Sequence, residues 1–415
     1  MEKRFASEHL DAAKQALADR MNLDEEAVPP WTLPPIRSRS AAEFLRTERP
    51  SLLRQFAGLV YGEIPPRPAW FDVDVVEEAP DAFGGLATRK EIAIRCAQNG
   101  MTRVLNLLLY IPNARTARVP LFFGLNFKGN HAASADAAVR FHPFRRYPTL
   151  DNSPRYADGR AEADQRGVEA RRFCFEECLR RGYACATMCY WDISPDHPYG
   201  FEDSILRMYF DAAAWNSPER PSAAISAWAW GVSRALDALE AQPEIDARRM
   251  AVHGLSRLGK TALWAGANDP RIALTVSCCS GTCGAKLAHR YFGEDFAWID
   301  LWNPHWTVPA FRQFVGHDAD LPVDQHQLLA CIAPRLAYVT SATEDLYADP
   351  KGEFLAAVAA SPAYRLFGMT GLGVTKMPPA GQPVGDDIGY YLRQGPHDCL
   401  PENWRALLDF ADQRL

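Results

Sequence analysis

The stretch that most constrains this chain runs from Met250 to Ala267 and reads MAVHGLSRLGKTALWAGA. A short apolar run leads into a serine bracketed by glycines, and a run rich in small residues follows. This order predicts a strand, a sharp turn and a helix. Because Gly254 and the small residues behind the serine permit a tight, partly strained turn, we expect Ser256 to project its hydroxyl from the end of a sheet.

The same residues also match a second motif. Gly254 to Thr261 (GLSRLGKT) satisfies the phosphate-binding pattern G-x-x-x-x-G-K-S/T, which also lies between a strand and a helix. In that interpretation Lys260 is a phosphate ligand. The eight residues alone therefore leave three interpretations open, namely an esterase, a nucleotidase and an ordinary structural turn that binds nothing.

Composition excludes several classes of partner. The 415 residues carry 45 basic and 51 acidic side chains, a formal charge of −6, which gives no reason to expect nucleic acid or an anionic membrane. No run of 18 apolar residues occurs. Without an internal repeat or a linker, we expect one domain over residues 1–415. The expected partners are small-molecule or oligosaccharide substrates, and the protein is expected to be a monomer.

The N-terminal residues show charges without a following apolar segment, so no export signal is recognised. The chain as written predicts a cytoplasmic protein, and a secreted or periplasmic one if a leader has been removed. Ten cysteines lie mostly in apolar runs, where reduced thiols pack as small hydrophobic groups. Cys174, Cys178, Cys185 and Cys189 have a spacing that zinc sites use, but the last two fall in a strand-like segment. We therefore expect no metal and no cofactor.

Hydrophobic patterns predict an α/β fold. Three alternating strands open an antiparallel sheet, and strands then alternate with helices, which requires parallel pairing. The expected class is an α/β-hydrolase fold, a three-layer α/β/α sandwich around a mostly parallel sheet. A helix within residues 1–25 is expected at the periphery, and 141–166 as a surface insertion near the pocket. Strands are expected at 70–78, 87–95, 103–111, 183–191, 272–277 and 335–341, and helices at 167–181, 223–241 and 402–414.

A strand beginning at Val119 runs into a loop rich in glycine and asparagine, GLNFKGNH. In α/β-hydrolases the loop after this strand supplies one backbone N–H to the oxyanion hole, and the residue after the nucleophile, here Arg257, supplies the other. We expect the first donor between Asn126 and Gly129, although an ordinary turn explains the same glycines. His131 precedes the serine, which is the wrong chain order for a catalytic base in this fold.

The order of later residues separates the two interpretations of the elbow. A serine hydrolase of this fold presents its triad in the order serine, acid, histidine, and Ser256, Asp345 and His397 supply that order. A nucleotidase needs a second apolar strand that ends in an aspartate for magnesium, whereas the strand at 335–341 ends in threonine and serine. Motif order therefore favours the esterase.

These residues resemble a known family, the glucuronoyl esterases of carbohydrate esterase family 15, bacterial branch. The resemblance runs from about Trp31 to the C-terminus. The segment GLSRLGK at 254–260 resembles the family's G-C-S-R-x-G-K elbow, and GLNFKGNH at 124–131 is similar to its oxyanion signature. Residues 321–330, 333–336 and 344–355 match its late segment.

The resemblance implies an activity and a set of roles. The family cleaves esters between the carboxyl group of glucuronic acid, often 4-O-methylated on xylan, and alcohols such as those of lignin, so glucuronoxylan–lignin fragments are the implied partners. By position, Ser256 is the nucleophile and His397 the base, while Arg257 polarises the carbonyl. Lys260 and Glu294 are implied to hydrogen-bond sugar hydroxyls, which suits an ammonium and a carboxylate.

Two positions depart from the family pattern. Many members hold the acid in an E-S-G turn, which is Cys279–Gly281 (CSG) here, and a thiol cannot stabilise an imidazolium as a carboxylate does. The acid is then Asp345, with Glu344 pointing outward and Asp349 capping the next helix. Tyr347 stands where bacterial members often place a tryptophan beside the sugar. A xylan or carbohydrate acetyl esterase, and a hydrolase-fold binding protein with weakened activity, remain the alternatives.

Overall fold

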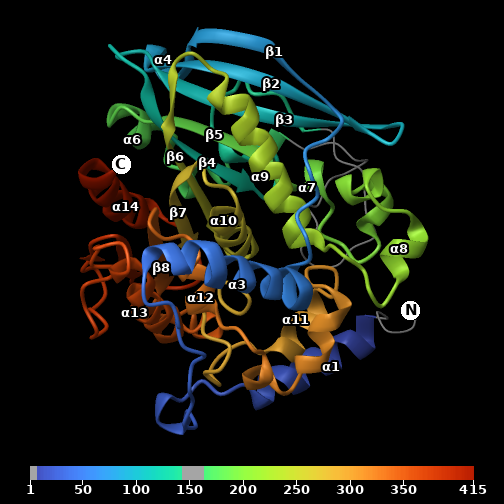
Figure 1. Cartoon of the computed structure of the whole chain (residues 1–415). Helices are drawn as coiled ribbons and strands as arrows, with labels where there is room; N and C mark the ends of the chain where they lie inside the picture. The colour runs from blue at the N-terminus through green and yellow to red at the C-terminus, as the bar shows by residue number, and fades with distance from the viewer. Residues whose placement is uncertain (1–6, 143–162) are drawn as a thin grey trace.

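A ten-stranded sheet runs through the protein, in the order β1-β2-β3-β5-β4-β6-β7-β8-β10-β9 (Figure 1). The computed structural model describes residues 7–142 and 163–415. Neighbouring strands from β5 through β4, β6, β7 and β8 to β10 are parallel, whereas β1, β2, β3 and β9 are paired antiparallel. The strands are β1 Trp70–Asp81, β2 Ala87–Gln98, β3 Met101–Pro112, β4 Val119–Asn126, β5 Ala184–Cys189, β6 Ile245–Leu255, β7 Ile272–Cys278, β8 Leu336–Ala342, β9 Val384–Gly385 and β10 Ile388–Arg393.

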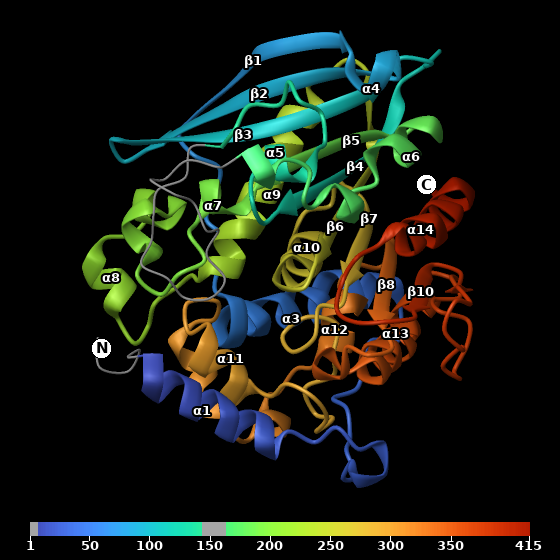
Figure 2. The same ribbon diagram turned by 180° about the vertical axis from the view of Figure 1, so that it is seen from behind.

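Helices cover both faces of the sheet, which confirms the predicted three-layer α/β fold. One buried core joins α9, α10, α12 and α13 to one face, and a second joins α6 and α14 to the other (Figure 2). The helices are α1 Ser7–Arg20, α2 Ala41–Glu43, α3 Arg49–Phe56, α4 Ala82–Gly85, α5 Asn130–Ala133, α6 Phe175–Arg180, α7 Tyr190–Ile193, α8 Ala212–Asn216, α9 Ala224–Glu240, α10 Arg257–Asn268, α11 Phe296–Trp302, α12 Gln325–Ala330, α13 Pro350–Arg365 and α14 Pro401–Arg414.

Alternation along the strands explains the two cores. On β3, Leu107 and Leu109 belong to the first core, while Leu108 and Tyr110 belong to the second. Successive side chains of a strand point to opposite faces, so a continuous apolar run marks a strand that is buried on both sides. Within the described part of the chain, no helix is both long and apolar enough to cross a membrane.

Some predicted elements differ from the structure. The helix expected at 167–181 is wrong over its first half, because Gly167 and Cys174 adopt φ values of +70° and +46°, which an α-helix cannot contain. Only α6 remains of it. The segment predicted as a surface insertion lies mostly outside the described residues. At the N-terminus, α1 packs near α11. The strand β10 was not predicted from the sequence.

The turn between β6 and α10 has the strained geometry expected of a nucleophile elbow. Ser256 adopts φ 59° and ψ −127°, which is unusual for a residue with a side chain. A Cβ at Gly254 would lie 2.0 Å from the carbonyl oxygen of Leu258, and one at Gly259 would lie 3.0 Å from Ser280 Cβ. The glycines are therefore required because strand, helix and following turn approach each other too closely for side chains.

Replacing this glycine tests the packing argument. In Gly254→Ala, the new methyl group overlaps a backbone carbonyl that cannot rotate away, so we expect a loss of roughly 2 kcal/mol or more of unfolding free energy. The matched control is Gly58→Ala, where a Cβ meets nothing within 4 Å. That variant should be neutral or slightly stabilised. Urea unfolding midpoints measure both, and equal midpoints would contradict the account.

Candidate active site

A cavity of about 180 Å³ opens where the parallel strands end. Six of the seven side chains predicted for the site line it, although they come from segments far apart in the sequence. Parallel strands place the loops that follow them at one edge of the sheet, which brings these segments together. The lining residues are Ser256, Arg257, Lys260, Cys279, Ser280, Gly281, Glu294, Trp298, Ile299, Trp302, Asn303, Trp306, Asp345, Ala348 and His397.

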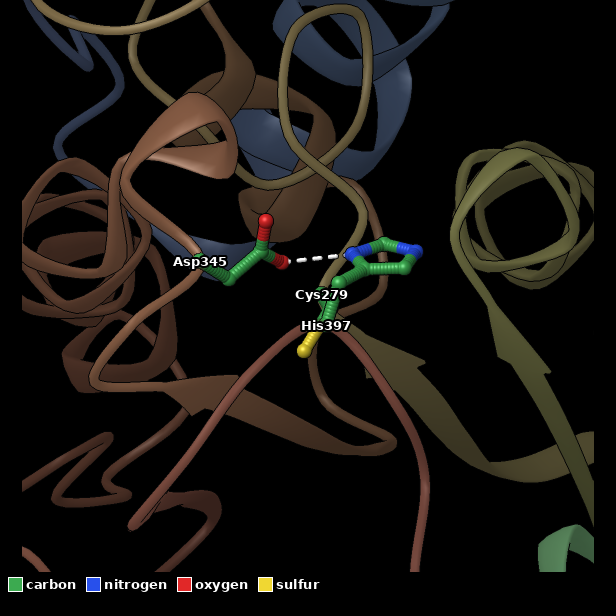
Figure 3. Close-up of side chains that lie close together, drawn as sticks. All are labelled: Cys279, Asp345 and His397. Atoms are coloured by element: carbon green, nitrogen blue, oxygen red, sulfur yellow. Dashed lines mark hydrogen bonds and ion pairs between the residues drawn. The ribbon is translucent and has the colours of Figure 1, made fainter.

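His397 and Asp345 form a direct pair. His397 Nδ1 lies 2.6 Å from Asp345 Oδ2 (Figure 3). Asp345 follows β8 and His397 follows β10, two adjacent parallel strands in which Ala342 lies opposite Arg393. The histidine side chain is 42% exposed and the carboxylate 8%. The pair therefore has a buried acid that orients the ring and a second ring nitrogen free of that bond, as a general base requires.

The two neighbouring carboxylates have other roles, and both predictions about them are confirmed. Glu344 is exposed. Asp349 is fully buried, and its Oδ1 accepts the N–H of Gly352, 2.8 Å away, at the start of α13. It also pairs with Arg290. Neither side chain lines the cavity, so Asp345 is the acidic side chain of this loop that reaches the histidine.

Cys279 lies beside the pair. Its Sγ, an oxygen of Asp345 and a ring nitrogen of His397 all lie within 4.8 Å of one another (Figure 3). A bond from Cys278 lowers the pKa of this thiol, but burial and the charges of Glu353 and Asp345 raise it to about 11. The thiol is therefore neutral near pH 7, and the carboxylate that lies against the ring of His397 is that of Asp345.

The four cysteines from Cys174 to Cys189, whose spacing resembles that of zinc sites, do not come together to form one. All ten cysteines are free thiols. Across residues 7–142 and 163–415, the trio of Cys279, Asp345 and His397 is the only group of three or more such side chains close enough to share a metal ion. The four cysteines between positions 174 and 189 are therefore packing residues.

Arg257 is held by a buried carboxylate that was not predicted. Its guanidinium pairs with Asp196, which also lies 2.8 Å from His305 Nε2 and accepts the Trp306 indole N–H at 2.7 Å. Burial raises the pKa of Asp196, but the charge of Arg257 and the hydrogen bond with His305 lower it by a larger amount. The pKa of this carboxyl group therefore lies well below its ordinary value. The ring of Trp306 lies 4.8 Å beneath the guanidinium. This cluster fixes the position of the arginine at the cavity wall.

The expected oxyanion donors are only partly in place. Since α10 begins at Arg257, the backbone N–H of this residue has no partner within the helix and lies at its positive end. None of the residues from Asn126 to Gly129 lines the cavity, and the Gly129 N–H donates to Asn126 Oδ1 at 2.7 Å. The loop starts at the correct edge of the sheet, but the Gly129 amide serves the loop's own turn and the Phe127 amide bonds Glu169.

Lys260 is buried, and one peptide group links it to the carboxylate of Glu353. Its ammonium donates to the carbonyl oxygen of Ser280, and the N–H of Gly281, at the other end of that peptide, donates to Glu353 Oε1 at 3.0 Å. Glu353 also accepts the Ser280 N–H at 2.8 Å and the Ser341 hydroxyl at 2.6 Å. Burial lowers the pKa of Lys260 and raises the pKa of Glu353 to about 7. The peptide dipole thus lies between a cation and a carboxylate.

Glu294 and Tyr347 occupy different surroundings. Glu294 lines the cavity, where burial raises its pKa and the charge of Lys260 lowers it. Tyr347 does not line the cavity, contrary to the role implied for it. It is 39% exposed and meets Trp298 edge-on, with ring centroids 5.7 Å apart. Trp298, with Trp302 one helical turn along α11, supplies the aromatic wall instead.

Comparison with known proteins identifies the family. Residues 215–368 match the family described as glucuronyl esterase, fungi. A solved structure of a promiscuous esterase of carbohydrate esterase family 15, from a marine bacterial metagenome, is 37% identical over 95% of this chain and 100% of that chain, with a TM-score of 0.86. This chain belongs to carbohydrate esterase family 15. Membership makes it a carboxylic ester hydrolase and sets aside the nucleotidase interpretation of the elbow.

Two further relatives of this family 15 esterase carry more specific names. A glucuronoyl esterase from Solibacter usitatus is 37% identical over 94% of this chain and 100% of that chain, with a TM-score of 0.87. A 4-O-methyl-glucuronoyl methylesterase from Podospora anserina is 45% identical over 127 residues, which are 28% of this chain and 26% of the relative. The second likeness is therefore confined to a minor part of either protein.

Removing the acid tests the pairing seen in the structure. In Asp345→Asn, the ring of His397 loses the charge that fixes its tautomer and stabilises its protonated form. We expect kcat to fall by roughly 10³–10⁴-fold with little change in unfolding free energy. Glu344→Gln is the matched control, because its exposed carboxylate is adjacent in sequence, and it should retain normal turnover. The opposite ranking of the two variants would move the acid to Glu344.

The position of Cys279 permits a second test. If this turn can present a carboxylate to His397, the double variant Cys279→Glu/Asp345→Asn should recover at least about tenfold of the lost kcat, because charge returns near the same ring. Cys279→Ala/Asp345→Asn is the control and should recover nothing. A folded double variant without recovery would show that the turn holds its side chain at an unsuitable angle.

The raised pKa of Glu353 leads us to expect that the stability of the protein depends on pH. Its pKa is raised in the folded protein, so its contribution to stability is fully present below its ordinary value of 4.5 and is lost as the pH rises to about 7. Glu353→Gln keeps the acceptor oxygen without titrating. Its unfolding free energy relative to the wild type should therefore rise between pH 4.5 and 7, measured by urea denaturation. Parallel pH profiles, as expected for Glu344→Gln, would contradict this.

Proposed function

We propose that this enzyme hydrolyses esters between the carboxyl group of glucuronic acid, including its 4-O-methyl derivative, and alcohols, through a Ser256–His397–Asp345 triad. The observation that carries the proposal is the 2.6 Å contact between His397 and Asp345 in the cavity that Ser256 also lines. The names of the relatives support the same substrate class. The mechanism follows from the positions of these groups and needs no cofactor.

Acylation begins with proton transfer. His397 Nε2 takes the hydroxyl proton as Ser256 Oγ attacks the ester carbonyl, and Asp345 stabilises the imidazolium through Nδ1. His397 then returns the proton to the alcohol oxygen, which leaves as the uronyl group becomes bonded to the serine. Water, deprotonated by the same ring, attacks this acyl-enzyme and releases glucuronate. The strained turn at Ser256 keeps the nucleophile exposed during both steps.

The negative charge of the tetrahedral intermediate develops near Arg257. Its backbone N–H at the first turn of α10 and its guanidinium offer hydrogen-bond donors there. Because Asp196, His305 and Trp306 already hold the guanidinium in place, little reorganisation is needed as the charge forms. This arrangement compensates for the Asn126–Gly129 loop, whose residues lie outside the cavity lining.

Lys260 and Glu294 suit the hydroxyl groups of a uronate. An ammonium has three N–H donors, and Ser280 takes one of them. The Glu294 carboxylate accepts no hydrogen bond from any side chain or backbone group in the described part of the protein. Together they present donors and acceptors to a polyol, and the indole rings of Trp298 and Trp302 can cover an apolar sugar face.

The decisive experiment compares three esters. We expect the wild type to hydrolyse benzyl glucuronate, with much lower kcat/KM for the galacturonate epimer, whose 4-hydroxyl points elsewhere, and for acetylated xylose. Ser256→Ala should abolish activity on all three, and a fluorophosphonate should label the wild type at Ser256 with one-to-one stoichiometry. Faster hydrolysis of the acetyl ester would favour the acetyl esterase alternative. Absence of labelling would favour a binding protein.

A further inference from the structure

The active-site cavity holds only part of the proposed substrate. Its volume of about 180 Å³ is below the roughly 300–1,000 Å³ of cavities that enclose whole ligands, so it suits one compact sugar unit. A second cavity of about 460 Å³ lies next to it, and Glu294 lines both. A glucuronate in xylan is attached to further sugars. The second cavity offers space beside the first for one of these sugars.

The N-terminal segment closes one side of this second cavity. Arg20, the last residue of α1, lines it and pairs with Asp295 at 3.3 Å. The Tyr291 hydroxyl donates to the carbonyl oxygen of Arg20 at 2.9 Å, and the Gly293 N–H donates to that of Asn22 at 2.8 Å. The N-terminal helix, which the sequence predicted at the periphery, therefore forms part of the wall of the second cavity, which Glu294 also lines.

Most charged groups around the second cavity already have partners. Arg290 pairs with Glu25 and Asp349, and both ring nitrogens of His289 lie within 2.9 Å of backbone carbonyl oxygens. Lys286 differs. It is 2% exposed, and among the described residues its Nζ donates to the carbonyl oxygens of Leu287 and Arg290, at 3.4 and 3.5 Å. Its charge also acts on Glu294, Asp318 and Asp349, none of which it is seen to hydrogen-bond. The two contacts with carbonyl oxygens are at the outer limit of hydrogen bonding, which leaves a buried ammonium with unused donor capacity.

Glu294 provides the matching acceptor. Its carboxylate lies near the charges of Lys260 and Lys286, both of which lower its pKa against the effect of burial. No hydrogen bond to this carboxylate is found among the described residues. A donor and an acceptor that are buried and incompletely satisfied, in a cavity with few apolar rings, suit a neutral ligand with many hydroxyl groups.

We propose that the second cavity binds the neutral sugar attached to the glucuronate, with Lys286 donating to its hydroxyls and Glu294 shared between the two sugar units. The proposal rests on the proposed function, since it assigns the neighbouring unit of the same substrate. It gives the enzyme a preference for uronate esters carried on an oligosaccharide over esters of the free uronic acid.

A larger cavity near α8 does not compete for this role. Its volume is about 770 Å³, and aromatic rings such as Tyr199, Phe201 and Trp215 line it. It shares no lining residue with the active-site cavity, because Trp302, Asn303 and Trp306 face one cavity and Pro304 and His305 face the other. Of these two cavities, the one at Glu294 is the one that shares a lining residue with the active-site cavity.

The test compares two benzyl esters, one of glucuronic acid and one of glucuronic acid linked to xylotriose. The wild type should have the higher kcat/KM on the oligosaccharide ester. Lys286→Met should lower kcat/KM about tenfold or more on that ester alone, mainly through KM, because one charge-assisted hydrogen bond is lost. Ala319→Trp keeps Lys286 but fills the exposed edge of the second cavity, and it should lose the same preference.

Lys90→Met is the matched control, since Lys90 is also buried but pairs with Glu244, on β2 and away from both cavities. It should keep the wild-type ratio of the two esters. The inference would be overturned if Lys286→Met lowered kcat/KM equally on both esters and Ala319→Trp left the ratio of the two kcat/KM values unchanged. A wild type with equal kcat/KM on both esters would also overturn it. A wild type inactive on both esters would refute the proposed function, and this inference with it.

Discussion

Two cations, Arg257 and Lys260, stand in the wall of one small cavity with little contact to bulk water, and the site depends on both remaining charged there. Moving a charge out of water costs several kcal/mol even after the protein relaxes, unless a partner or hydrogen bonds offset it. Asp196 offsets the charge of Arg257 directly, whereas Glu353 acts on Lys260 across the peptide between Ser280 and Gly281. Neither carboxylate lines the cavity, whereas both cations do, so the two cations can also contact a substrate there.

The parts of this site that sequence could predict are those encoded locally or by chain order. The turn at Ser256 is predictable because two glycines, a serine and small residues must occur together for strand and helix to approach so closely. Asp345 and His397 are predictable because the fold fixes which strands their loops follow. Four residues after Ser256, Lys260 suggested a nucleotide, and only the order of the later residues separated the two interpretations.

The supporting residues escaped prediction for a physical reason. Asp196 lies 61 positions from Arg257, and Glu353 lies 72 from Gly281, so no spacing or period links each pair. Their contacts arise only when separate loops meet at one edge of the sheet. Local backbone geometry also overruled the helix predicted at 167–181, because two residues with positive φ, Gly167 and Cys174, delay its start to Phe175. Tyr347 lies outside the cavity lining, where the tryptophans of α11 stand instead.

The two outer strands of the sheet affect how copies of this protein meet. β1 is twelve residues long and forms one edge (Figure 1), and its sequence includes Asp72, Asp74, Glu77 and Glu78. β9, at the other edge, has only two residues. Charged side chains along an edge strand, here partly paired with Arg89 and Arg95 of β2, and a very short strand both discourage hydrogen bonding between the sheets of neighbouring molecules. Neither margin of this wide sheet is therefore a favourable place for a second copy to add a strand.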